Sequence, residues 1–271
     1  MEQNNKITIP VAIIAAGIII GGAIFLSSGN AKKVIPDIQN PTVDSTNTTD
    51  LSAMKWKDVD STDHIKGNPQ APVKFVVYSD TECPYCKTFD ATINKLTDKY
   101  GKNGTLAFVY RHFPLDSLHK KARNEAEALE CAGSLGGNEK FFLMLDGIMQ
   151  KTNSNDKLDA AELPRIANTI GINTSDFNTC LSSGKFAKTV QDDADAGANW
   201  GVRGTPNATY VFETPVNEET KSFVEKLNTQ FKQRPSDPDI LFVSADGQKV
   251  ILAGALPFEI ADQILTLMKI K

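Results

Sequence analysis

The tetrapeptide Cys83-Pro84-Tyr85-Cys86 is the stretch of this sequence with the clearest chemistry. It stands where an apolar, strand-like run over residues 73–78 ends and a helical pattern begins at Pro84. Two thiols at this spacing can form and break a disulfide, and a CxxC pair at a strand-to-helix junction is typical of redox sites. The motif therefore predicts thiol chemistry at the start of a helix.

The helix N-terminus determines how the two thiols would differ. It carries free N–H groups and about half a positive elementary charge, which stabilises a thiolate at Cys83. The first cysteine of such motifs has a pKa lowered to roughly 3.5–7.5. Pro84 suits the first turn, where its missing N–H would have no partner. We expect Cys83 to be the exposed nucleophile and Cys86 the resolving thiol; half of a zinc site or a merely structural disulfide are the alternatives.

Two acidic residues and three histidines complete the set of titratable candidates. Asp80 and Glu82 precede the motif, and a carboxylate near a thiolate raises the thiol pKa, so they are candidates for tuning the cysteines and moving a proton. The alternative is that both are solvated loop acids. We expect His112 to make a structural hydrogen bond behind the redox helix, and His64 and His119 to lie on the surface. A closed zinc site is hard to assemble from so few ligands.

The elements that must position these residues begin in the order strand, helix, strand. A second β-type run, 105–110, follows the helix predicted over 84–100 after a glycine-containing break. Amphipathic helical stretches come next, and strands and a terminal helix close the chain. The later predicted elements are helices at about 118–149, 163–170 and 186–198, strands at 209–212, 240–244 and 248–252, an extra helix of unassigned function within 217–234, and a helix at 257–268.

The N-terminal part of the chain differs from the rest in composition. Residues 7–26 contain no charge over 20 positions, enough to cross a bilayer as a helix. We expect 1–28 to be an uncleaved transmembrane anchor, with a cleaved signal peptide as the alternative. Residues 29–54 are polar and predict a flexible linker, and 55–271 predict one folded domain. The net charge of −4 without a basic cluster argues against a nucleic acid partner.

Three motifs together resemble a known family. They are 78–86 (YSDTECPYC), 111–115 (RHFPL) and 201–206 (GVRGTP). In this order the chain resembles the DsbA-like thiol-disulfide oxidoreductases of bacterial envelopes, within the thioredoxin superfamily. The resemblance implies an α/β thioredoxin fold, a central mixed sheet flanked by helices, with a helical subdomain inserted at about 115–200.

The resemblance also implies roles for residues far from the cysteines. Pro206 would be a cis-proline facing the redox pair, and the Thr205 backbone would offer β-type hydrogen bonds to an extended substrate; a trans turn proline is the alternative. Asn207 and Ala208 depart from the apolar strand start that is usual in the family, which puts substrate choice in doubt. Glu82 stands where thioredoxins and cytochrome-maturation reductases carry Trp, which argues against those branches.

The remaining cysteines, Cys131 and Cys180, fall in the helical insertion. Some DsbA-like relatives staple two insertion helices with a disulfide, and the resemblance implies the same pairing here. A disulfide that closes a loop of about 50 residues could stabilise the folded domain by on the order of 3–4 kcal/mol. Two buried free thiols are the alternative. A bridged pair would indicate folding in an oxidising compartment and hence an extracytoplasmic domain.

From this resemblance and the apolar segment 7–26, we expect a single-pass cell-membrane protein of the bacterial envelope, a monomer with its catalytic domain extracytoplasmic. It would oxidise unfolded or reduced exported proteins with the Cys83–Cys86 disulfide, without another cofactor. A membrane thiol oxidase of the DsbB or VKOR type would restore the disulfide. The alternatives are a reductase or isomerase of the same fold, and a non-enzymatic envelope module that binds partners or a metal.

Overall fold

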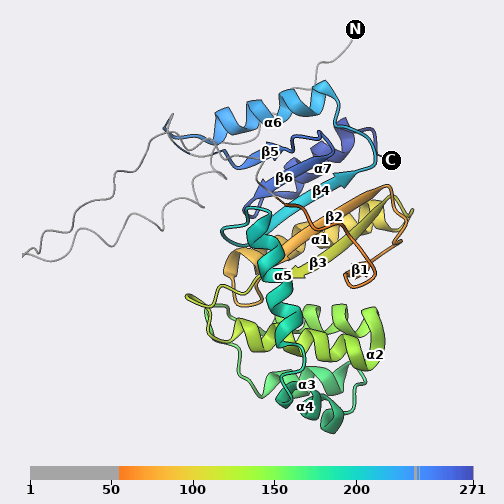
Figure 1. Cartoon of the computed structure of the whole chain (residues 1–271), viewed down its shortest axis with the longest axis vertical. Helices are drawn as coiled ribbons and strands as arrows, with labels where there is room; N and C mark the ends of the chain where they lie inside the picture. The colour runs from red at the N-terminus through yellow and green to blue at the C-terminus, as the bar shows by residue number, and fades with distance from the viewer. Residues whose placement is uncertain (1–54, 235–236, 238, 271) are drawn as a thin grey trace, which may run out of the picture. The chain divides into compact units, whose positions relative to one another are not determined.

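The computed structural model describes residues 55–234, 237 and 239–270, and Figure 1 shows their arrangement. The anchor predicted over 1–28 and the linker predicted over 29–54 lie outside the described residues. Within the described part of the chain, no helix is both long and apolar enough to cross a membrane.

A six-stranded mixed sheet forms the centre of the described domain. Its spatial order is β1-β3-β2-β4-β6-β5. The second strand pairs in parallel with the third and antiparallel with the fourth, and all other pairs are antiparallel. This is the predicted mixed sheet. The strand bounds are β1 His64–Lys66, β2 Val73–Ser79, β3 Leu106–His112, β4 Asn207–Phe212, β5 Leu241–Val243 and β6 Lys249–Ala253.

Helices cover the sheet and fill the connection between β3 and β4. The bounds are α1 Pro84–Leu96, α2 Ala122–Lys151, α3 Glu162–Thr169, α4 Thr174–Ser182, α5 Ala187–Asn199, α6 Glu218–Phe231 and α7 Phe258–Leu267. A π-helical turn, Thr97–Gly101, extends α1. In Figure 1, α2, α3 and α4 gather at one end of the domain, and α5 runs from them toward the sheet. The helix predicted within 217–234 is confirmed as α6.

The alternation of side chains along β2 divides the core. Phe75 and Val77 belong to the large apolar cluster that also contains the buried residues of α1 and α7. Val76 and Tyr78 point to the other face and pack with Trp200 in a smaller cluster. Because successive strand residues face opposite sides, this strand is buried on both faces, which explains its nearly continuous apolar sequence.

The helical insertion, residues 113–206, leaves and rejoins the sheet on either side of β2. His112 at the end of β3 pairs in register with Ser79, and Asn207 at the start of β4 pairs with Tyr78. Both ends of the insertion therefore lie at the carboxyl end of β2, the same end that leads into the CxxC helix.

One sequence-based prediction about these elements was wrong, and two features were missed. The first long helix begins at Ala122, and Leu118 lies before it with 67% of its surface exposed, so it is not part of the packing stripe. That helix is also interrupted, because Gly136 and Gly137 have non-helical backbone angles. The three-residue β1 was not predicted, since a strand this short carries too little periodic pattern.

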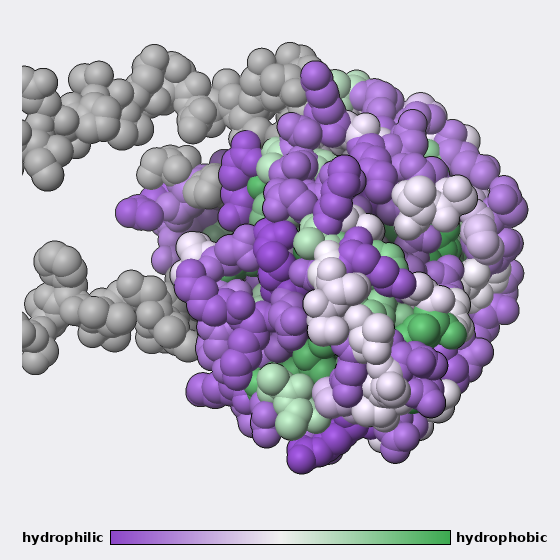
Figure 2. Space-filling view, turned by 60° about the horizontal axis from the view of Figure 1, so that its bottom comes forward, coloured by the Kyte–Doolittle hydropathy of each residue, from purple (hydrophilic) through white to green (hydrophobic). Residues whose placement is uncertain are grey.

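The surface is mostly polar. Figure 2, which brings the lower end of Figure 1 forward, shows a predominantly hydrophilic face with small, separated apolar patches. Scattered apolar residues of this kind are normal for a folded domain.

Candidate active site

A short buried loop connects β2 to α1 and carries the first cysteine. The side chains of Asp80, Thr81 and Glu82 are all buried. Cys83 is the N-cap residue of α1, with an extended backbone and no side-chain cap, and Pro84 is the first helical residue. The N–H groups of the first turn are thus directed at the region of the Cys83 sulfur, as expected at a helix N-terminus.

Cys83 and Cys86 are both thiols in this structure, and their environments differ. A hydrogen bond from the Cys86 thiol lowers the pKa of Cys83 to about 6, helped by the backbone N–H groups of Cys86 and Tyr85 and opposed by burial. Burial raises the pKa of Cys86 well above its usual value, and the neighbouring Cys83 sulfur adds to the effect. The Asp80 N–H donates to Cys86 Sγ at 3.5 Å. Such a pair favours the thiolate at the first cysteine.

The prediction that Cys83 is exposed was wrong. Only 3% of its surface is accessible, whereas the neighbouring Tyr85 is 51% exposed. The cause is the loop before β4, because Cys83 Sγ–H donates to the Thr205 carbonyl at 3.4 Å. The nucleophile is therefore reached along this loop rather than from an open surface.

The Thr205–Pro206 peptide bond is cis, the geometry implied by the resemblance. The Gly254 N–H donates to the Pro206 carbonyl at 3.0 Å, so the loop is held to the end of β6. The Thr205 side chain helps to lower the pKa of Cys83, whereas Asn207 Oδ1 is buried and has no hydrogen-bond partner among the described residues. The cis-proline loop thus presents a backbone carbonyl to Cys83.

Asp80 and Glu82 are buried acceptors, so the alternative of solvated loop acids was wrong. Asp80 accepts hydrogen bonds from the N–H groups of Glu82 and Leu115, both at 2.8 Å, and from His119. Glu82 accepts from the Thr152 hydroxyl at 3.1 Å and from the N–H groups of residues 157 and 158. Backbone N–H donors explain how two carboxylates can be buried in one loop.

Glu125 of α2 joins this acidic group and was missed in the sequence. It accepts a hydrogen bond from the Thr81 hydroxyl at 2.6 Å. Burial and the neighbouring Glu82 raise its pKa to about 8. The available signal was its helical spacing beside the buried Ala122, Ala126 and Leu129, which places it on the packed face of α2.

The three histidines are all at least partly buried, which corrects two predictions. His119 is only 5% exposed and bonds Asp80 Oδ2 through Nδ1 at 2.9 Å. His64 is half-buried and stacks on Phe141 with ring centroids 3.6 Å apart. His112 is buried, as predicted, and with His64 it bonds Glu130. Burial alone would raise the pKa of Glu130, but these hydrogen bonds lower it to about 2. Each of the two misplaced histidines has a carboxylate partner, Glu130 for His64 and Asp80 for His119.

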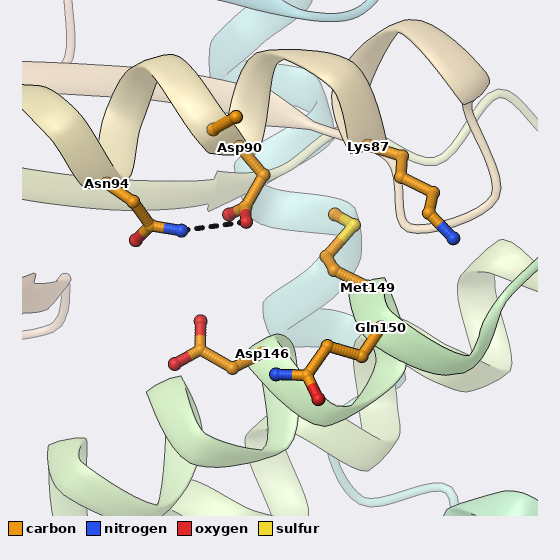
Figure 3. A pocket seen from close by; sticks show the side chains of 7 residues that line it. Lys87, Asp90, Asn94, Asp146, Met149 and Gln150 are labelled. Carbon is orange, nitrogen blue, oxygen red and sulfur yellow. Dashed lines mark hydrogen bonds between the residues drawn. The ribbon is translucent and has the colours of Figure 1, made fainter.

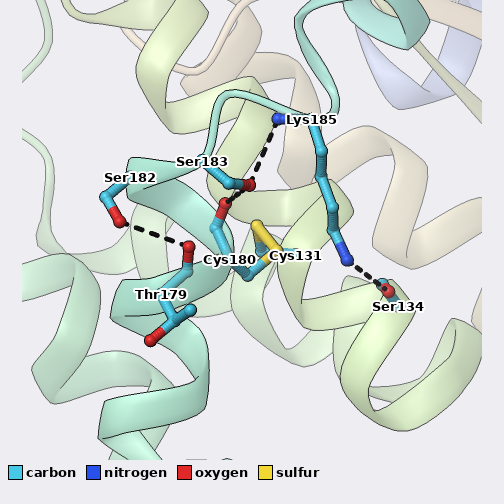
Figure 4. Close-up of a disulfide and its surroundings, with 7 residues drawn as sticks. All are labelled: Cys131, Ser134, Thr179, Cys180, Ser182, Ser183 and Lys185. Atoms are coloured by element: carbon cyan, nitrogen blue, oxygen red, sulfur yellow. Dashed lines mark hydrogen bonds between the residues drawn. A yellow bond between two sulfur atoms is a disulfide. The ribbon is translucent and has the colours of Figure 1, made fainter.

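Cys131 and Cys180 form a disulfide between α2 and α4, the pairing implied by the resemblance. The Cα atoms are 5.9 Å apart, within the usual range for a disulfide. Figure 4 shows the bond with nearby polar contacts, which include Ser183 Oγ donating to the Cys180 carbonyl and Lys185 Nζ donating to Ser134 Oγ.

A groove of about 570 Å³ lies between α1 and the second half of α2 (Figure 3). Its lining on α1 includes Lys87, the residue after Cys86. Asp90 and Asp146 face it from opposite sides, and Asn94 donates to Asp90 at 2.9 Å. Burial raises the pKa of both carboxyls, and Asp146 adds to the effect on Asp90. Within the described residues, no group of three or more His, Cys, Asp or Glu side chains could hold a metal ion.

Comparisons with known proteins agree with this geometry. A family model described as Thioredoxin matches residues 59–226. The Na(+)/H(+) antiporter NhaA 3 of Salinispora tropica is 33% identical over 144 residues, which are 53% of this chain and 21% of the antiporter. This chain thus spans only about a fifth of the length of that relative. The "Probable disulfide bond formation protein D" of Bacillus anthracis is 25% identical over 247 residues, 86% of this chain and 100% of that protein.

A solved structure shows the same fold over most of the chain. The alpha-DsbA1 structure of Wolbachia pipientis superimposes with a TM-score of 0.57 at 18% identity, covering 78% of this chain and 92% of that one. The family match includes the CxxC helix, the whole helical insertion and the cis-proline. The chain therefore has a DsbA-like fold and belongs to the thioredoxin family.

Proposed function

We propose that this chain is a protein thiol-disulfide oxidoreductase of the DsbA type, with Cys83 and Cys86 as its redox centre. The observation that carries the proposal is the difference between the two thiols. The pKa of Cys83 is lowered to about 6 at the start of α1, whereas burial raises the pKa of Cys86. The name of the Bacillus anthracis relative, a disulfide bond formation protein, supports the same chemistry.

The net direction that we propose is oxidation of substrate thiols. A substrate thiolate attacks Cys83 Sγ of the Cys83–Cys86 disulfide, a substrate–Cys83 bond forms, and the electron pair of the broken bond leaves on Cys86, which takes up a proton. A second substrate thiolate then attacks the substrate sulfur of the mixed disulfide and releases Cys83 as a thiolate. The substrate gains a disulfide, and the protein is left reduced, with a Cys83 thiolate and a Cys86 thiol. A stabilised Cys83 thiolate favours this direction because it stabilises the reduced protein.

The cis-proline loop is the proposed substrate-binding edge. In the free protein the Thr205 carbonyl accepts the hydrogen bond of the Cys83 thiol. An extended substrate segment placed along residues 205–206 could bond the Thr205 backbone while its own sulfur reaches Cys83. Pro84 and Tyr85 border the same sulfur, and the exposed Tyr85 ring offers an apolar contact for the substrate.

The cellular setting is part of the proposal. The apolar segment 7–26 would anchor the chain through a membrane helix within residues 1–28, followed by a linker over 29–54 and the folded domain over 55–271. The Cys131–Cys180 disulfide supports an extracytoplasmic domain, because such bonds persist in oxidising compartments. The substrates would be reduced or unfolded exported proteins, and a membrane thiol oxidase of the DsbB or VKOR type would reoxidise the monomeric enzyme.

The deciding measurement is the reduction potential of the Cys83–Cys86 pair, obtained by equilibrating the protein with glutathione buffers. We expect a value well above that of thioredoxin, about −270 mV. A value near or below −270 mV would favour the reductase alternative and contradict the proposed direction. Oxidation of a reduced, unfolded protein by the disulfide form tests the activity itself, and its absence would favour a non-enzymatic binding module.

A further inference from the structure

Asp80 is the only one of the buried residues considered above that contacts both cysteines and a histidine. Its backbone N–H donates to Cys86 Sγ at 3.5 Å, and its carbonyl accepts from the Cys83 N–H at 3.2 Å. Its carboxylate accepts from His119 Nδ1 at 2.9 Å. A change of charge at His119 therefore acts on a residue that bonds the sulfur of Cys86 and the backbone of Cys83.

His119 lies in a strongly acidic setting. Three groups act on it from three different segments: Asp80 from the redox loop, Cys83 from the start of α1, and Asp156 from the loop after α2. Burial opposes protonation, but these three together raise the pKa of His119 above its ordinary value.

The other charged groups nearby have partners of their own. Glu82 bonds Thr152 and the backbone after it, and Glu125 bonds Thr81. The backbone N–H groups of Lys120 and Lys121 donate to Asp156. Among the described contacts, His119 is thus the one ionisable side chain that hydrogen-bonds the Asp80 carboxylate.

We propose that His119 is a positioning residue for the redox centre, which neutralises Asp80 and thereby stabilises the Cys83 thiolate while its imidazole is protonated. This proposal rests on the proposed role of Cys83 as the nucleophile. With the imidazolium in place, the Asp80–His119 pair has no net charge. After the imidazole loses its proton, one buried carboxylate remains beside the thiolate and opposes its formation.

The coupling must act in both directions. If the imidazolium favours the Cys83 thiolate, the thiolate favours the imidazolium by the same free energy. Reduction of the Cys83–Cys86 disulfide creates that thiolate, so reduction must raise the pKa of His119. The redox state of the Cys83–Cys86 pair and the protonation state of His119 would thus be thermodynamically linked.

The first test uses His119→Asn, whose side-chain amide can still donate to Asp80 but carries no charge. The readout is the ultraviolet absorbance of the Cys83 thiolate, followed against pH in the reduced protein. We expect the pKa of Cys83 to rise by about one, because the lost positive charge leaves the Asp80 carboxylate to oppose the thiolate. The glutathione equilibrium constant at pH 7 should then move about fivefold toward a less oxidising disulfide.

Two further variants separate charge from structure. His64→Asn removes another histidine bonded to a carboxylate, and it should leave the Cys83 titration unchanged. Asp80→Asn removes the negative charge, so it should lower the pKa of Cys83, the opposite of His119→Asn. If His119→Asn folds normally and leaves the thiolate titration unchanged, or lowers the pKa of Cys83, the proposal is wrong.

The second test needs no variant of the histidine. The imidazole signals of His119 are titrated by NMR in the oxidised and the reduced protein, with His64 as the internal reference. We expect a higher pKa of His119 in the reduced protein and no change at His64; equal values at His119 in the two states would overturn the proposal. Neither readout depends on a protein substrate, so a failure of the proposed oxidase activity would appear separately, in the assay with reduced protein.

Discussion

The two cysteine pairs of this protein are equally buried and have opposite chemistry. The exposed fractions are 3% and 2% for Cys83 and Cys86, and 1% and 7% for Cys131 and Cys180. The first pair sits at a helix N-terminus among hydrogen-bond donors and a buried acidic cluster. The second joins α2 and α4 inside the insertion as a disulfide, and both pairs lie within the large apolar cluster. Reactivity therefore follows from the polar groups around the sulfur atoms, since burial is the same for both pairs.

The largest effect expected from this comparison is the loss of disulfide transfer on replacing Cys83. Cys83→Ser removes the thiol of lowered pKa, and oxidation of a reduced protein substrate should fall to the uncatalysed rate. The double variant Cys131→Ala/Cys180→Ala is the matched control, and it should retain transfer because the Cys83–Cys86 pair stays intact. Comparable activity of Cys83→Ser and the wild type would remove the basis for calling the first pair the reactive one.

The second prediction concerns stability, for which the Cys131–Cys180 pair should matter more than the Cys83–Cys86 pair. The Cys131–Cys180 bond closes a loop with a sequence separation of 49 residues, so removing it should lower the free energy of unfolding by about 2–4 kcal/mol. Urea unfolding of the double alanine variant, compared with the wild type under non-reducing conditions, measures the loss. The pKa of Cys83 should stay unchanged in this variant; a shift would mean that the insertion disulfide also shapes the redox centre.

The third prediction tests the acidic cluster beside the reactive pair through pH. The pKa of Glu125 is about 8 in the folded protein against an ordinary 4.5. Between these values the unfolded chain has released a proton that the folded protein keeps, so stability must fall as pH rises, by up to about 1.4 kcal/mol per pH unit. Glu125→Gln should remove this component and leave the protein more stable than the wild type near pH 8.

The control for the third prediction is Glu127→Gln on the same helix, where the side chain is only partly buried. It should keep the wild-type dependence of the unfolding free energy on pH. An unchanged pH dependence in Glu125→Gln would show that this carboxyl is not the protonated group of the cluster.

The smallest expected effect concerns polar contacts around the structural disulfide. Lys185 donates to Ser134 at 3.3 Å in an exposed position near Cys180 (Figure 4). Exposed contacts of this kind contribute little, so Lys185→Ala should change the free energy of unfolding by less than about 0.5 kcal/mol. A loss above 1 kcal/mol, as for a buried contact, would show that the second pair also depends on its polar surroundings.

Much of the fold was predictable because its elements carry strong local patterns. The apolar run before Cys83, the CxxC at the start of a helix and the extra helix within 217–234 all appear in the structure where the sequence predicts them. The mixed sheet order depends on pairings between distant strands, and it entered the prediction through the resemblance to a family. Short elements such as β1 gave no usable pattern.

The polar part of the site was harder to predict because burial of a polar residue depends on a partner that is distant in sequence. His119 stands between the exposed Leu118 and two lysines, so its neighbours indicate a surface position. Its burial follows from Asp80, 39 residues earlier. Glu82 is buried for the same reason, since its acceptor oxygens meet donors in residues 152–158. No local periodicity encodes such long-range pairs.

The attachment of the helical insertion has a consequence for how this architecture can change. Residues 112 and 207, which flank the insertion, pair with neighbouring residues of β2 from its two sides, so they lie only about 10 Å apart, two strand spacings. A segment whose ends are this close can be lengthened, shortened or exchanged without moving the strands, because the closure entropy grows only slowly with its length. The insertion is thus attached at one place on the sheet, and any replacement must supply donors to Glu82, a partner for Asp80 and apolar side chains to pack on Phe108 and Tyr110.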